Sequence, residues 1–284
     1  MKTPEQLKGS IRSFAKKNGL FSQEVLQMFL FERVLERLSQ SKYRDNFILK
    51  GGLLISSMIG INERTTMDMD TTVKGLSMDE RVIENIVKEI LALDVGDGIE
   101  FIYDRIAPIH EDDRYNNFRV FFFAKYGKIN NPMKIDITTG DEITPAAIEY
   151  SFKSVFEDDI IKIKAYNLET ILAEKFETVI GRNISTTRAR DFYDLHTLFR
   201  IYKDIINYDL LAYAIERTAT KRDSLSEISE WRDICEEMRS EPSLISLWEK
   251  YCNYNKYASE ITFSDTIDSV VSLGKIISEA HQKL

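Results

Sequence analysis

The chain is poor in the residues that cross-link small proteins or hold zinc. Its 284 residues include two cysteines, Cys235 and Cys252, and three histidines. Two cysteines are too few for a disulfide framework, and no cluster of Cys and His has the spacing of a zinc site. No apolar run approaches about 18 residues, and the N-terminal segment lacks the apolar stretch of a signal peptide. We therefore expect a soluble, cytoplasmic protein with no membrane contact.

The chain also lacks an excess of positive charge. Its 38 lysines and arginines face 46 aspartates and glutamates, which gives a formal net charge of −8. A chain of this charge is a poor general binder of polyanions, so any contact with nucleic acid has to come from a local basic patch.

The distribution of strand-like and helical patterns divides the chain in two. Hydrophobic residues make up 43% of it, enough for a sizeable core, and the length suits one large or two modest domains. Strand patterns dominate the first part, and helical spacing continues from Asn167 to the end. No proline- or glycine-rich linker separates the parts. We predict an α+β domain over residues 1–165, a mixed sheet flanked by helices, and an all-helical domain over 166–284.

Local patterns predict the elements of the first part. Apolar spacing predicts a helix over 22–40, and Ser77 with Glu80 forms a predicted capping box at the start of another. Alternating and β-branched runs predict strands over 46–50, 66–73, 99–103, 118–126, 133–139 and 159–166. The segment 127–132 is a predicted hairpin loop.

A glycine pair follows the strand predicted over 46–50. Gly51 and Gly52 precede an apolar helical segment that Gly60 can end. Glycines here let the backbone approach a ligand closely, and a helix N-terminus offers free N–H groups to phosphate. A lone glycine pair is usually only a turn. The strand–helix–strand order makes this one, with Lys50 before it, a candidate phosphate-binding turn.

Two carboxylates follow on the next strand. Asp68 and Asp70 alternate with methionines, so both point to one face of an extended strand. Asp136 alternates with isoleucines in the later strand over 133–139. A pair of this kind is most often a solvated strand face. If the two strands are neighbours, however, the three carboxylates converge as ligands for Mg²⁺, which takes oxygen donors and substrate phosphates.

The order of these motifs resembles the polymerase-β type of nucleotidyltransferase. The resemblance rests on the glycine pair, on the pattern R-x-T-x-D-x-D that begins at Arg64 and includes Thr66, and on Asp136. The segments LAEKFETVIGR (172–182) and RARDFYDLHTL (188–198) then make the chain similar to the AbiEii/AbiGii toxins of type IV toxin–antitoxin systems. The resemblance spans about residues 50–198.

That resemblance implies a fold and an activity. The fold would be a nucleotidyltransferase core followed by a helical domain. The activity would be transfer of a nucleotidyl group from a nucleoside triphosphate, with GTP as the first candidate and Mg²⁺ or Mn²⁺ as the metal, to an acceptor such as the 3′ end of tRNA. Lys50, Gly51, Gly52, Arg64 and Thr66 would bind the nucleotide. The partner would be a genetically linked winged-helix antitoxin that need not contact the toxin, and we expect a monomer.

The helical half adds charged residues to the candidate site. Lys175, Thr178 and Arg182 share one face of a predicted helix and can bind triphosphate or RNA; the alternative is a solvated face with neighbouring glutamates. The resemblance favours Lys175 as the charge that stabilises the triphosphate.

An arginine-rich segment follows that helix. Arg182, Arg188 and Arg190 lie in a stretch without acids, so the segment is a candidate RNA contact. Asp191 and Asp194 come next at helical spacing. They can orient Lys175 or Arg190 by ion pairing, or act as the general base.

Other functions remain open at this level. The same enzyme class can modify a protein hydroxyl or a small molecule such as an aminoglycoside. A nucleotide- or RNA-binding module without turnover belongs to a different class, and a costly cluster of like charges argues against it. Leu53 stands where related sequences often have Ser or Thr, so no hydroxyl is available there for a phosphate.

Overall fold

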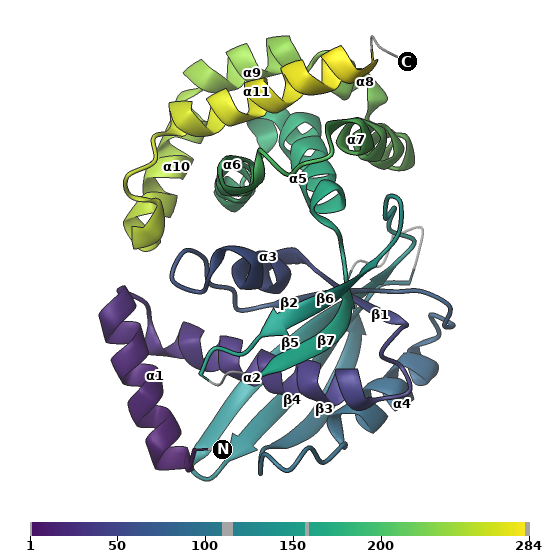
Figure 1. Ribbon diagram of the computed structural model, residues 1–284, viewed down its shortest axis with the longest axis vertical. Helices are drawn as coiled ribbons and strands as arrows, with labels where there is room; N and C mark the ends of the chain where they lie inside the picture. Colours follow the sequence, from purple (N-terminus) through teal and green to yellow (C-terminus); the bar gives the residue numbers. More distant parts are fainter. Residues whose placement is uncertain (1, 110–115, 157–158, 282–284) are drawn as a thin grey trace. The chain divides into compact units, whose positions relative to one another are not determined.

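The computed structural model describes residues 2–109, 116–156 and 159–281 (Figure 1). The chain folds into two compact units. The first comprises residues 1–141 and 148–165, and the second comprises residues 142–147 and 166–284. No helix among the described residues is both long and apolar enough to cross a membrane.

The first unit is a mixed sheet with helices. Its elements are α1 (Pro4–Asn18), α2 (Ser22–Gln40), β1 (Phe47–Lys50), α3 (Gly51–Ile59), β2 (Met69–Val73), α4 (Glu80–Leu91), β3 (Glu100–Pro108), β4 (Phe118–Tyr126), β5 (Ile129–Thr139), β6 (Ile148–Lys153) and β7 (Ile160–Ala165). The strand order is β3-β4-β5-β2-β1-β7-β6. The pairs β2–β5 and β1–β7 are parallel, and the others are antiparallel. This confirms the α+β class and the mixed sheet.

Alternation of side chains gives the sheet one apolar face. On β5, Met133, Ile135 and Ile137 are buried, whereas the residues between them are partly exposed. The apolar side chains fill the core because α2 and α4 pack against that face of the sheet, and α3 lies on the opposite side (Figure 1). Charged residues of the central strands are therefore left on the face that carries α3.

The second unit is helical, as the sequence predicts. Its elements are α5 (Leu168–Arg182), the 3₁₀ turn η1 (Asn183–Ser185), α6 (Ala189–Tyr202), α7 (Tyr208–Arg222), α8 (Leu225–Ser229), α9 (Trp231–Ser240), α10 (Pro242–Tyr254), the 3₁₀ turn η2 (Lys256–Ala258) and α11 (Phe263–His281). The segment 142–147 joins these helices because Thr144 N–H donates to Thr170 Oγ1 and Asn167 Nδ2 donates to Thr144 O.

Local predictions were wrong at several points. Neither α1 nor β6 is predicted from the sequence. The hairpin between β4 and β5 is a two-residue turn, because β5 already begins at Ile129. The capping residue of α4 is Asp79, whose side chain accepts hydrogen bonds from the N–H groups of Arg81 and Val82. Ser77 lies two residues too early to reach those groups.

The corrected cap gives a stability prediction. Asp79→Ala should lower the free energy of unfolding by about 1 kcal/mol, since it leaves two N–H groups at the helix start without an acceptor. The matched variant Ser77→Ala should change it by no more than a few tenths of a kcal/mol, on the order expected for a surface site. Urea denaturation of both variants measures the difference, and equal losses would contradict the assignment of the cap.

Candidate active site

The turn between β1 and α3 leaves no room for side chains. Gly51 has a φ of +66°, and a Cβ atom there would lie 2.1 Å from Asp70 Oδ2. A Cβ atom on Gly52 would lie 2.4 Å from Arg64 Nη1 and 2.8 Å from Thr66 Oγ1. Gly51 therefore supplies a left-handed backbone as well as space. The glycine pair brings the start of α3 directly against Asp70.

Four charged residues lie opposite one another on four adjacent strands. Arg119 of β4 pairs in register with Asp136 of β5, which pairs with Asp70 of β2, which pairs with Lys50 of β1. Residues directly opposite in a sheet share a face. We call Arg119, Asp136, Asp70 and Lys50 the charged row. Their charges follow one another along the row as positive, negative, negative and positive. The predicted convergence of β2 and β5 is thus present, with Asp70 and Asp136 side by side.

Lysine and arginine side chains of the sheet pair with two of the predicted carboxylates. Arg119 Nε and Nη2 each donate to one oxygen of Asp136 over 2.7 Å. Lys134 Nζ lies 2.8 Å from Asp68 Oδ1. Neither cation is among the residues predicted from the sequence. Lys134 could have been found, because it precedes Asp136 by two residues on one strand and so shares its face.

A third cation, Lys50, pairs with a carboxylate that was not predicted. Lys50 Nζ donates to Asp141 Oδ2 over 2.6 Å, and Thr138 Oγ1 donates to the same oxygen over 2.7 Å. Burial alone would raise the pKa of Asp141, but Lys50 and the hydroxyls of Thr138 and Thr72 lower it below its usual value. Asp141 follows the end of β5, so no strand periodicity points to it.

The pKa of Asp70 is raised above its usual value. Burial raises its pKa, and the nearby Asp136 and Asp68 raise it further. Lys50 and a hydrogen bond from the Gly52 N–H act in the opposite direction. The causes are therefore desolvation and like charge, a combination that makes Asp70 a candidate functional carboxylate.

Arg64 and Thr66, both predicted to bind nucleotide, lie buried beneath the glycine turn. Arg64 is 2% exposed, and its Nη1 donates to Thr65 O over 2.9 Å. Thr66 Oγ1 accepts a hydrogen bond from the Asp68 N–H. These contacts shape the loop that carries Asp68. A direct contact with nucleotide stays a prediction for both residues.

The carboxylates match the donor chemistry of a hard cation in part. Within the described ranges, no group of three His, Cys, Asp or Glu side chains is placed to hold a metal ion. Asp70 and Asp136 nevertheless face each other across neighbouring strands. Because Mg²⁺ takes one or two carboxylates and fills its shell with water and phosphate oxygens, this pair fits such an ion. The full ligand set with Asp68 stays a prediction.

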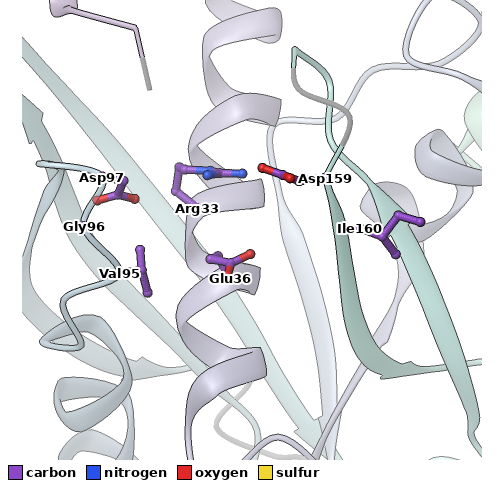
Figure 2. Close-up of a pocket in the computed structure, with 7 residues that line it drawn as sticks. All are labelled: Arg33, Glu36, Val95, Gly96, Asp97, Asp159 and Ile160. Carbon is purple, nitrogen blue, oxygen red and sulfur yellow. The ribbon is translucent and has the colours of Figure 1, made fainter.

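A pocket of about 370 Å³ lies elsewhere in the first unit (Figure 2). Its lining comes from α2, the loop before β3 and the segment at the start of β7: Arg33, Glu36, Val95, Gly96, Asp97, Asp159 and Ile160. Figure 2 shows Arg33 pointing toward Asp159. Arg33 is already paired with Glu32, and Asp97 with Arg37. The pocket contains none of the predicted site residues.

In the second unit, one lysine is held by two carboxylates. Lys175 Nζ of α5 lies 2.5 Å from Asp191 Oδ1 and 2.8 Å from Asp194 Oδ2, both on α6. The side chains of Asp191 and Asp194 are 3% and 0% exposed. Burial would raise the pKa of Asp191, but Lys175 and Arg188 lower it. Of the roles left open by the sequence, orientation of Lys175 is the one that these contacts match.

The arginine-rich segment carries exposed positive charge. Arg182 and Arg188 are exposed and Arg190 is half-buried. Arg188 Nε lies 2.6 Å from Asp191 Oδ2. Thr178, predicted to face the same way as Lys175, accepts a hydrogen bond from Arg222 Nη1. Arg222, which is not predicted from the sequence, also forms ion pairs with Glu174 and Glu177.

A glycine turn against the strand residue Asp70, a second aspartate on the neighbouring strand and a helical second unit agree with the nucleotidyltransferase arrangement that the sequence resemblance implies. The model of the AbiEii family, described as the nucleotidyl transferase AbiEii toxin of a type IV toxin–antitoxin system, matches residues 33–264. The chain belongs to this family. No curated protein matches it.

Solved structures share the fold. The protein JHP933 from Helicobacter pylori is 19% identical with a TM-score of 0.53, over 93% of this chain and 94% of its own. An H. pylori protein assigned as a nucleotidyltransferase is 20% identical with a TM-score of 0.52, over 93% of this chain and 97% of its own. At these identities the likeness shows the fold.

The contact between Gly51 and Asp70 gives a prediction with a built-in control. Gly51→Ala should destabilise the protein by at least about 2 kcal/mol, from left-handed strain plus overpacking against Asp70. Gly19 has nearly the same φ, +65°, but open space around it. Gly19→Ala should therefore cost only the strain, about 1 kcal/mol. Chemical denaturation compares the two, and equal losses would show that Asp70 can move away.

The pairing of Lys175 predicts a pH-dependent loss of stability. Lys175→Met should destabilise the protein at pH 7 by about 3 kcal/mol, because it removes one partner of a buried ion-pair cluster. Without Lys175 the pKa of Asp191 rises in the folded state, so the folded variant takes up a proton more readily as the pH falls. The difference from the wild type should therefore narrow between pH 7 and pH 5. A difference independent of pH would contradict the electrostatic origin.

Proposed function

We propose that this protein is a metal-dependent toxin that transfers a nucleotidyl group from a nucleoside triphosphate to the 3′ end of tRNA. The observation that carries the proposal is the charged row, which sets Asp70 and Asp136 side by side next to the glycine turn. Membership of the AbiEii family supports the reaction class. GTP is the nucleotide to test first, and Mg²⁺ or Mn²⁺ is the proposed metal.

The proposed roles follow from the contacts within each unit. The N–H groups at the start of α3 hold phosphate oxygens, and Asp70 and Asp136, with Asp68 beside them, hold the metal. A divalent cation bound there would neutralise triphosphate charge and polarise the reacting phosphoryl group. The acceptor hydroxyl attacks the α-phosphorus and gives up its proton to water, the new P–O bond replaces the bond to the β-phosphate oxygen, and pyrophosphate leaves. Lys175, oriented by Asp191 and Asp194, stabilises the negative charge that develops.

The acceptor and the setting are part of the proposal. Arg182, Arg188 and Arg190 supply the local positive charge that an RNA contact needs on a chain with a net charge of −8. The proposal also includes a genetically linked winged-helix antitoxin and action in the cytoplasm. We further propose that the protein is a monomer and that its domain boundary follows residue 165.

The test is labelling of RNA by the purified protein. Each of the four nucleoside triphosphates, labelled at the α-phosphate, is incubated with total RNA and Mg²⁺ or Mn²⁺. A tRNA-sized band should appear, most strongly with GTP, and a chelator should abolish it. Asp70→Asn, Asp136→Asn and Asp68→Ala should each reduce labelling by about 100-fold or more. Asp159→Asn, a matched charge change away from the charged row, should leave it unchanged.

Other outcomes would redirect the assignment. Undiminished labelling in the aspartate variants would refute the proposed site. Labelling of protein or of an aminoglycoside in place of RNA, seen by mass spectrometry, would keep the enzyme class and replace the acceptor. Nucleotide binding that is independent of metal and gives no labelled product would favour a binding module.

A further inference from the structure

The three predicted metal ligands differ in their pairing with protein cations. Asp136 binds Arg119 through both oxygens, and Asp68 lies against Lys134. Asp70 has Lys50 directly opposite it on β1, yet within the described part of the chain no lysine or arginine forms an ion pair with Asp70. The Lys50 ammonium is instead paired with Asp141.

The Lys50–Asp141 pair is a built feature of the first unit. The two side chains are only 14% and 20% exposed. Thr138 Oγ1 donates to the same Asp141 oxygen that binds Lys50. Thr138 sits on β5 two residues after Asp136, beside Thr72 of β2, so it belongs to the same face as the charged row. Asp141 is therefore fixed by the sheet that carries Asp70 and Asp136.

The effect of this pair on Asp70 follows from the register. Lys50 and Asp70 face each other on antiparallel strands, where opposing Cβ atoms lie about 4.5–5.5 Å apart. If Asp141 did not hold the ammonium, Asp70 would be the nearest remaining carboxylate of the row. Asp70 is half-buried on β2, so an ion pair formed there would be screened less by water than one at the surface and would compete with another cation.

We propose that Asp141 is a positioning residue that holds the Lys50 ammonium away from Asp70 and so keeps Asp70 available to a divalent cation. This inference rests on the metal site of the proposed function. Asp141 itself binds no metal in this account and acts only through Lys50.

The experiment measures binding of Mn²⁺ alone to the full-length protein, without nucleotide, by the electron paramagnetic resonance signal of free Mn²⁺. Asp141→Asn should weaken Mn²⁺ binding roughly tenfold, because the freed ammonium competes for Asp70. Thr138→Val keeps the charge and removes one hydrogen bond to Asp141, so it should weaken binding in the same direction by about twofold. Thermal unfolding confirms that each variant is folded.

Two double variants of equal net charge separate positioning from general electrostatics. Asp141→Asn combined with Lys50→Met should recover most of the lost affinity, because no ammonium remains to occupy Asp70. Asp141→Asn combined with Lys74→Met should stay weak, since Lys74 is exposed beyond the end of β2. The outcome is thus decided by which lysine is removed.

Each other result overturns the inference. Recovery in both double variants would show that only net charge matters, and recovery in neither would make Asp141 a ligand or a purely structural residue. Unchanged binding in Asp141→Asn would remove its role. If the wild type bound no Mn²⁺, the metal site of the proposed function would itself be wrong, a result distinct from selective effects among the variants.

Discussion

The arrangement of the first unit depends on two like charges that lie side by side on adjacent strands. Asp70 and Asp136 are direct neighbours on the parallel strands β2 and β5, and both burial and the nearby charge of Asp136 raise the pKa of Asp70. The fold offsets this cost with Arg119 at one end of the row and Lys50 at the other. Gly51 is needed because any side chain there would collide with Asp70. The glycine turn and the position of Asp70 therefore depend on each other.

The second unit has the opposite arrangement of charges. There, one cation is shared by two buried carboxylates, and Asp191 is shared in turn between Lys175 and Arg188. Such a cluster is costly to desolvate, so it contributes fixed geometry more than stability. It holds the Lys175 ammonium at one place on the α5 surface. The family motifs of the two units therefore specify charges that the fold holds at fixed positions, a property that electrostatic stabilisation of a transferring phosphoryl group requires.

Periodicity predicted the carboxylates and not their partners. In an extended strand every second side chain lies on the same face, so the sequence alone predicts that Asp68 and Asp70 share a face. The same alternation predicts that Asp136 lies on the polar face of its own strand. Arg119 and Asp141 join the site only through strand pairing and the turn after β5, which single-strand patterns do not encode. The error at α4 was local in kind. Ser77 and Asp79 are both good capping residues, and a sequence pattern alone does not choose between them.

The charged row is asymmetric, and the asymmetry bears on how a cation would enter it. Arg119 engages both oxygens of Asp136, so a metal there must share or displace a bidentate pair. Asp70 accepts a hydrogen bond from Gly52 N–H, while its lysine neighbour is held by Asp141. A cation entering the proposed site would therefore meet the least competition at Asp70, beside the N–H groups of α3 that would face the phosphates. In the proposed function the glycine turn would place the phosphates, and the pairing of Lys50 with Asp141 would leave Asp70 open to the cation that accompanies them.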